Sequence, residues 1–208
     1  MLGDVIFPSD MFTSIPTTPL KMAGLKLNLG CGVNKIDGYI NVDKYGEPDF
    51  QHDLEILPWP WTDNSVQEIR LIHVLEHLGQ QTDVYLGIIK EMYRICQDRA
   101  IIFIKIPHYR HEYFFDDPTH VRVVTPNGLR LFSQRINRET IERGGSNSLL
   151  GINLGVDFEI IQIKRKPGKD WLKLHPNGLD DSDQINLETS IYNNLIEEYE
   201  IQLEVIKT

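Results

Sequence analysis

The sequence predicts an α/β fold, in which a mostly parallel sheet carries helices on both faces. Short apolar runs alternate with segments of helical periodicity, and a glycine turn follows the first apolar run. The run Ala100–Ile106 is almost wholly apolar and β-branched, which is typical of a strand buried on both faces. Since 208 residues with 41% hydrophobic content suffice for one core, we expect one domain over residues 24–208. Residues 1–23, rich in Pro, Ser and Thr, read as an irregular leader.

Four strands are expected in the first half of the chain. They are Leu25–Leu29, Tyr39–Val42 with Asp43 at its end, a possible strand at Asp49–Leu54, and Gln67–His73. Each is a short apolar run bounded by glycine, proline or polar residues. The segment Val33–Gly38 predicts a loop, because no convincing helix fits between the first two strands.

Two helices are expected, and each is opened by a threonine. Thr82 is the predicted N-cap of the first helix, whose inner face would be formed by residues at helical spacing. These are Tyr85, Ile88, Ile89, Met92, Tyr93 and Cys96. Thr125 precedes Pro126 at the first position of the second helix, with an inner face of Leu129, Phe132 and Ile136.

Two further strands are expected late in the chain, at Phe158–Lys164 and Tyr199–Lys207. The second alternates apolar with polar residues, so one of its faces is expected to be wetter. The two strands can pair in antiparallel fashion at an edge of the sheet.

Composition disfavours several classes of partner. The formal net charge of −9 disfavours binding to a nucleic-acid backbone, which relies on Lys and Arg. No apolar run is long enough to span a bilayer, and the segment MLGDVIFPSDMF lacks the basic and apolar regions of a signal peptide. The two cysteines, Cys31 and Cys96, are expected to be reduced thiols. We therefore expect a cytoplasmic protein without nucleic-acid or membrane partners; the oligomeric state stays open.

The most informative segment is the turn Leu27-Asn28-Leu29-Gly30-Cys31-Gly32. Glycines after a first strand let the backbone turn sharply and approach a ligand, and an acidic residue at the tip of the second strand can accept hydrogen bonds from ribose hydroxyls. Asp43 has that position. A dinucleotide site is disfavoured, because Lys35 stands where a third glycine of G-x-G-x-x-G would fall and no helix follows to face a pyrophosphate.

Four motifs in order, LNLGCG, GYINVD, DLEILPWPWTDNSVQEI and HVLEHL, resemble the class I S-adenosylmethionine-dependent methyltransferases, nearest to bacterial small-molecule enzymes of the type 11 kind. The resemblance covers residues 25–107 and implies a Rossmann-like, seven-stranded sheet with one antiparallel edge strand. It departs from the family where the helix after the glycine turn is shortened to a loop.

The resemblance also implies the residues that contact S-adenosylmethionine. Asn28, Gly30 and Gly32, with Cys31 between the glycines, would line its methionine part. Asp43 would hold the ribose. Asp53 and Leu54 would border the adenine, and His73 would lie near the methionine moiety. Glu76 and His77 follow His73; capping and packing roles are as open for them as functional ones.

The segment PHYRHEYFFDDPTHVRVVTP follows the fifth strand, at the edge of the sheet where α/β active sites gather. We expect its titratable residues to serve the acceptor by acid–base work, with an Asp orienting a His. The candidates are His108, His111, His120, Asp116 and Asp117. Two alternatives stay open: a metal site built on the spacing of His108 and His111, which we do not favour, and a polar loop held by its own hydrogen bonds. The segment also resembles a PH…DPTH pattern of uncharacterised bacterial methyltransferases.

The sequence thus predicts a methyltransferase that moves the sulfonium methyl group in line to a small-molecule or saccharide acceptor. Two other functions stay open. The chain could be a noncatalytic module that binds the cofactor or a nucleotide, or, less favoured, a dinucleotide-dependent oxidoreductase.

Overall fold

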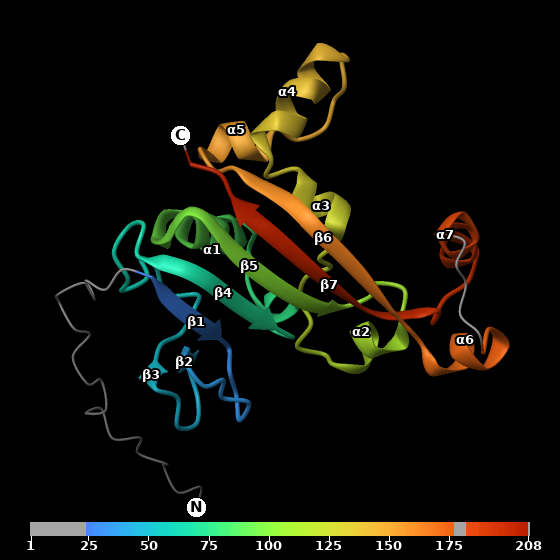
Figure 1. The fold of residues 1–208 in the computed structure, drawn as a ribbon, viewed down its shortest axis with the longest axis horizontal. Coiled ribbons are helices and arrows are strands. Elements are labelled where there is room, and N and C mark those ends of the chain that lie inside the picture. The colour runs from blue at the N-terminus through green and yellow to red at the C-terminus, as the bar shows by residue number, and fades with distance from the viewer. Residues whose placement is uncertain (1–23, 177–181, 208) are drawn as a thin grey trace, which may run out of the picture.

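The computed structural model describes residues 24–176 and 182–207, and these build a seven-stranded sheet (Figure 1). The strand order is β3-β2-β1-β4-β5-β7-β6. The strands are β1 (Leu25–Leu29), β2 (Ile40–Asp43), β3 (Phe50–Gln51), β4 (Val66–Ile72), β5 (Cys96–Pro107), β6 (Phe158–Pro167) and β7 (Ile196–Val205). The first five in spatial order run parallel, which confirms the predicted α/β fold class. The expected leader at residues 1–23 lies outside the described residues.

One strand of the sheet is reversed, as expected. It is β7, which pairs in antiparallel fashion with β5 on one side and β6 on the other. The predicted pairing of the two late strands is therefore confirmed. The reversed strand lies one place in from the edge, because β6 covers its outer side.

The third strand is shorter than the expected Asp49–Leu54. Only Phe50 and Gln51 pair with β2, and the chain then turns away. Asp53 causes this turn, because its Oδ1 accepts a 3.0 Å hydrogen bond from the backbone amide of Glu55.

The helices follow the strands in chain order. They are the short 3₁₀ helix η1 (Leu75–His77), α1 (Thr82–Ile95), α2 (Glu112–Asp116), α3 (Pro126–Arg130), α4 (Gln134–Glu142), α5 (Leu150–Leu154), α6 (Lys169–Leu174) and α7 (Ser182–Ile191). None of the helices in the described ranges is long and apolar enough to cross a membrane.

The two predicted helix starts fare differently. Thr82 is the first helical residue and not the N-cap, which is Gln81 without a side-chain hydrogen bond. Thr125 is the N-cap as predicted, since its hydroxyl accepts a 3.0 Å bond from the Gly128 amide. The helix that we expected to continue to Ile136 instead ends early, because Ser133 caps a separate helix by accepting a bond from the Ile136 amide.

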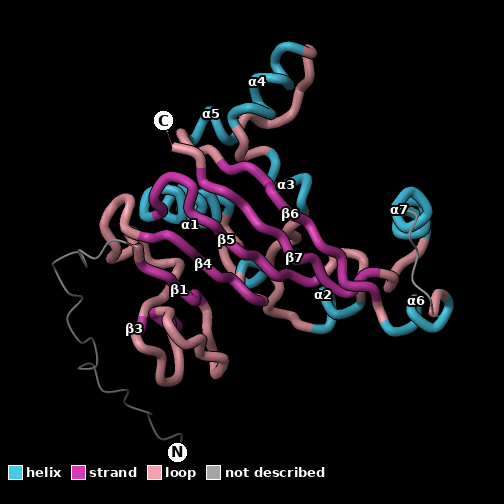
Figure 2. Tube along the Cα trace, in the orientation of Figure 1, coloured by secondary structure: helices cyan, strands magenta, loops and turns pink. Residues whose placement is uncertain are grey.

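The core lies on one face of the sheet. Ile102, Ile104 and Ile106 of β5 are buried there, against the apolar side of α1. Figure 1 shows α1 and α3 behind the sheet, with no described helix in front of its central strands. In Figure 2 loops alone join β1, β2 and β3. The prediction of helices on both faces is therefore wrong for the part of the chain that the structure describes.

The second face of the sheet is polar and half-buried. Arg70 of β4 lies beside Phe103 of β5 in the register, and its guanidinium contacts that ring as well as the Glu68 carboxylate at 3.0 Å. Lys26 reaches the same carboxylate at 3.5 Å. The run 100–106 is thus buried on one face only, because its outward residues Ile101, Phe103 and Lys105 stay partly exposed among charged neighbours.

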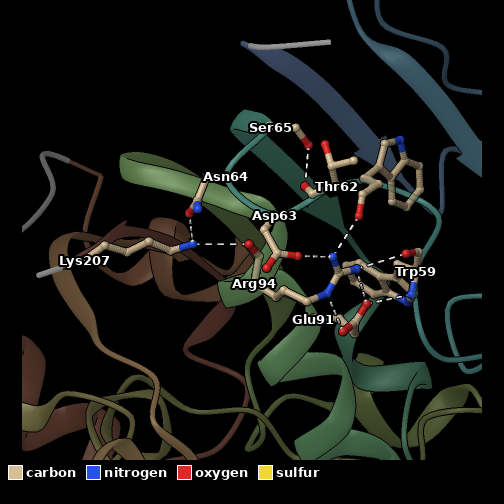
Figure 3. Close-up of polar contacts among 9 residues, drawn as sticks. Trp59, Thr62, Asp63, Asn64, Ser65, Glu91, Arg94 and Lys207 are labelled. Atoms are coloured by element: carbon tan, nitrogen blue, oxygen red, sulfur yellow. Dashed lines mark hydrogen bonds and ion pairs between the residues drawn. The ribbon is translucent and has the colours of Figure 1, made fainter. Parts of the chain in front are cut away.

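Arg94 of α1 holds the long connection between β3 and β4, as Figure 3 shows. Its guanidinium donates to the Trp59 and Trp61 carbonyl oxygens, both at 2.9 Å, and forms ion pairs with Asp63 and Glu91, both at 2.7 Å. Glu91 in turn accepts a 2.6 Å bond from the Trp59 amide. This network fixes a segment without regular structure, whose first residues border the site described next.

Candidate active site

The glycine turn after β1 is shaped by two residues with left-handed backbone. Gly30 has φ +66° and Gly32 has φ +51°. A Cβ on Gly30 would lie 2.5 Å from Cγ2 of Val74, so glycine is required where the turn meets the segment after β4. A Cβ on Gly32 would meet nothing within 4 Å, so the backbone of the turn is open to a ligand there.

Asp43 joins the tip of β2 to this turn. Its Oδ2 accepts a 2.8 Å hydrogen bond from the Gly32 amide, and its Oδ1 accepts a 2.9 Å bond from the Tyr45 amide. A carboxylate oxygen offers two acceptor positions, so each oxygen keeps one for a further donor.

A cavity opens at the carboxyl ends of β1, β2 and β4. It is lined by Gly30, Asp43, Lys44, His52, Asp53, Leu54, His73, Val74, His77 and Leu78. A second hollow shares Asp43 with it and is lined by Gly32, Val33, Lys35, Asp43, Tyr45, Gly46 and Glu47. The structure therefore gathers most of the residues assigned to the cofactor: Gly30, Gly32, Asp43, Asp53, Leu54 and His73.

Asn28 and Cys31 are buried and do not line either cavity. The Asn28 amide is buried and donates to the Asn34 carbonyl at 3.0 Å and to Asn41 Oδ1 at 2.9 Å. Cys31 is buried, and burial is the first cause that raises the pKa of its thiol. Both residues support the loop at residues 33–38, which takes the place of the helix that is usual after the glycine turn in the family.

His73 directly follows β4, and its backbone lies in the left-handed region at φ +55°, which is uncommon for a residue with a side chain. Its amide donates to the Lys105 carbonyl at 2.8 Å. The ring points towards two acids, with Nδ1 3.4 Å from Glu76 Oε1 and Nε2 3.8 Å from Glu198 Oε2. The unusual backbone thus places the imidazole at the cavity beside the buried Glu76.

His108 and His111 occupy structural positions in the segment after β5. The Nδ1 atom of each accepts a backbone hydrogen bond, from the Arg110 amide at 3.1 Å and the Tyr113 amide at 3.2 Å. His111 is the N-cap of α2. Burial, aided by the nearby Arg110, lowers the pKa of His108 to about 4. Neither ring lines the cavity, and their two Nδ1 atoms are not available as a pair of metal ligands.

His120 is the histidine of this segment that reaches the site. Its ring lies 4.6 Å from the ring of His77, a cavity residue, centroid to centroid. Asp117 is linked to His77 through Thr119, whose hydroxyl donates to Asp117 at 2.6 Å and lies 2.9 Å from His77 Nδ1. The hydrogen bonds that Asp117 accepts from the Thr119 hydroxyl and from the Thr119 amide lower the pKa of Asp117.

The segment 108–122 is fastened at both ends. The His108 amide donates to the Glu197 carbonyl of β7 at 2.8 Å. The Val121 and Arg122 amides both donate to the Glu76 carbonyl, at 2.9 and 3.1 Å. The segment therefore closes over the end of β4 and brings His120 to His77.

Sequence reasoning did not assign five lining residues: Lys44, His52, Val74, His77 and Leu78. All of them follow a strand directly or within a few residues, and this position at the sheet's carboxyl edge is the signal that identifies them.

No protein-family model matches this chain, and no curated protein matches it. Solved structures do match. A SAM-dependent methyltransferase from Archaeoglobus fulgidus is 19% identical, covers 88% of this chain and 86% of its own, and superposes with a TM-score of 0.54. The YcgJ protein from Bacillus subtilis is 14% identical, covers 92% and 94%, and gives 0.52. These likenesses, the strand order and the glycine turn agree that the chain has the fold of the class I S-adenosylmethionine-dependent methyltransferases.

Proposed function

We propose that this protein is an S-adenosylmethionine-dependent methyltransferase, and that its acceptor is a small molecule or a saccharide. The observation that carries the proposal is the Asp43 carboxylate, which stands between the two cavities with an acceptor position left on each oxygen. Two adjacent ribose hydroxyls are the donors that such a carboxylate suits.

The residues around Asp43 fit this cofactor better than a dinucleotide. The chain after the glycine turn, residues 33–38, is a loop in the described structure, so no helix N-terminus faces the turn to receive a pyrophosphate. S-Adenosylmethionine carries no phosphate and needs none. Leu54 supplies an apolar wall, and Asp53 beside it supplies an acceptor for the adenine end.

The bound cofactor supplies a reactive methyl group on its sulfonium, so the protein has mainly to orient the acceptor atom towards that methyl group and to exclude water. Gly30 and Val74 meet at one wall of the cavity, and His73 and His77 also line it. His120 is assigned to the acceptor side, because its ring contacts that of His77 although His120 does not itself line the cavity. His108 and His111 take positioning roles, since their Nδ1 atoms hold the backbone of the segment.

Isothermal titration calorimetry tests the proposal. The protein is titrated separately with S-adenosylhomocysteine, S-adenosylmethionine and NAD. We expect both adenosyl ligands to bind and NAD to give no heat of binding. Binding of NAD alone would contradict the proposal. Release of S-adenosylhomocysteine on incubation with pooled small-molecule acceptors then separates an enzyme from a noncatalytic binding module.

A further inference from the structure

Glu76 is a buried acid without a hydrogen-bond partner. Its residue is 1% exposed, and neither of its carboxylate oxygens is hydrogen-bonded. An isolated carboxylate is costly to bury unless a cation or a donor reaches it. The His73 Nδ1 atom lies 3.4 Å from Glu76 Oε1 without forming a hydrogen bond. The guanidinium of Arg122 is engaged elsewhere, by the Gly79 carbonyl.

Two imidazole rings reach Glu76, and their hydrogen bonds fix which nitrogen is free. His120 Nδ1 lies 2.8 Å from the Phe114 carbonyl, which can only accept, so Nδ1 carries the proton. The Thr119 hydroxyl donates its own proton to Asp117, so it accepts from His77 Nδ1. Each neutral ring therefore offers the lone pair of Nε2.

This arrangement is the one that proteins use around metal-bound histidines. There the second ring N–H donates to a carbonyl or towards a carboxylate, which sets the tautomer and orients the ring. In this chain the Phe114 carbonyl serves His120, and the Thr119–Asp117 pair serves His77.

One ligand atom from each of Glu76, His77 and His120 lies within 4.8 Å of the others. Ligand atoms about 2.1 Å from a tetrahedral ion lie roughly 3.4 Å apart, so each side chain has to move by less than about an ångström. We propose that Glu76, His77 and His120 bind a divalent transition-metal ion, with two nitrogens and one carboxylate as ligands. This donor set suits Zn²⁺, Co²⁺ or Fe²⁺ better than Mg²⁺, and three protein ligands leave a coordination position open.

The position of the ion suggests a role in the reaction. This role rests on the proposed function. His77 lines the cavity assigned to the cofactor, and His120 belongs to the segment assigned to the acceptor. An ion between them would contact an acceptor hydroxyl at the open position and lower its pKa, which helps the oxygen to act as a nucleophile.

Cobalt titration tests the site directly, because Co²⁺ bound to nitrogen and oxygen ligands absorbs visible light. The full chain is stripped with EDTA, dialysed and titrated with CoCl₂ at pH 7.5, and ZnCl₂ is added at the end. We expect visible bands that saturate at one equivalent of Co²⁺ and vanish on addition of Zn²⁺. Titrations that show no saturable band would overturn the proposal.

Matched variants identify the ligands. Glu76→Gln, His77→Gln and His120→Gln should each abolish the saturable band, and Thr119→Val should weaken Co²⁺ binding by about tenfold to a hundredfold while keeping all three ligands. His175→Gln is the control, since this histidine lies outside both the cluster and the segment 108–122, and it should bind like the wild type. Circular dichroism checks that each variant is folded. Full binding by folded Glu76→Gln and His120→Gln would overturn the assignment.

The same samples distinguish this inference from the proposed function. Calorimetry with S-adenosylhomocysteine is done on the EDTA-treated wild type. Metal binding without adenosyl binding contradicts the proposed function and supports the metal site. Adenosyl binding without metal binding supports the proposed function and overturns the metal site.

Discussion

The Gly32 amide donates a 2.8 Å hydrogen bond to Asp43 Oδ2, which ties the turn after β1 to the tip of β2. Asp43 therefore holds the shape of the site besides offering acceptors to a ligand. A change at Asp43 should alter stability and ligand binding together.

Asp43→Ala should weaken S-adenosylhomocysteine binding and also lower the melting temperature. Each hydrogen bond to a charged group contributes about 1.5–3 kcal/mol, and the variant loses those of the Gly32 and Tyr45 amides as well as any to the ligand. Calorimetry and thermal unfolding measure the two effects. Asp37→Asn, on the loop after the glycine turn, is the control and should change neither. Wild-type affinity in a folded Asp43→Ala variant would refute the ribose assignment.

Gly30→Ala should destabilise the fold more than Gly32→Ala. Both positions have left-handed backbone, but only the Gly30 Cβ would overlap Val74. Overpacking costs about 1–3 kcal/mol in addition to the backbone strain, which both variants share. Urea unfolding measures the difference. Gly30→Ala should destabilise the Val74→Ala variant less than it destabilises the wild type, because the overlapping methyl groups are then absent. Equal losses of stability in Gly30→Ala and Gly32→Ala would contradict the steric argument.

His108 should make stability fall with acid. Its pKa is lowered from 6.5 to about 4 in the folded chain, mainly by burial. Between these values the unfolded chain binds a proton that the folded chain does not. The free energy of unfolding should therefore decrease as pH falls from 6.5 to 4, by at most about 1.4 kcal/mol per pH unit from this group, and stay unaffected by it above 6.5.

Urea unfolding of the wild type and His108→Gln at pH 7, 6 and 5 isolates this contribution, because every other titrating group is shared. The variant should show a shallower pH dependence. Parallel curves for the two proteins would mean that His108 titrates alike in the folded and unfolded states.

Arg94→Ala should destabilise the chain by about 3 kcal/mol, since it leaves the buried Glu91 carboxylate without its cation and two carbonyl oxygens without their donor. The loop after β3 should loosen, and ligand affinity should fall because Asp53 and Leu54 begin that loop. Arg138→Ala is a matched control on an exposed face of α4 and should change stability by less than about 0.5 kcal/mol. If Arg94→Ala were as stable as Arg138→Ala, the Arg94 network would not stabilise the loop after β3.

Local patterns were sufficient to predict the strand Leu25–Leu29, the Thr125 cap and the two late strands as elements, because each depends on neighbouring residues. The uncovered face of the sheet was missed for a physical reason. Ile101 and Phe103 are apolar, so the alternation that marks a half-exposed strand is hidden, and Phe103 is in fact covered by the Arg70 guanidinium.

Part of the candidate site could not be predicted from local sequence patterns. His108 and His111 have the spacing of metal ligands, yet their Nδ1 atoms serve the backbone. Glu76 and His77 meet His120 only because the Val121 and Arg122 amides fasten the later segment to the Glu76 carbonyl. No periodicity records a contact between residues so far apart in the chain.

The double fastening of segment 108–122 also affects how the protein can diversify. The ends are held by backbone bonds, at His108 to Glu197 and at Val121 and Arg122 to Glu76, and backbone bonds do not depend on side-chain identity. Residues between these anchors, such as the exposed Tyr113 and Phe115, can be exchanged without disturbing either anchor. Libraries randomised at those positions are the natural starting point for changing the acceptor while β1, β2 and Asp43 stay as they are.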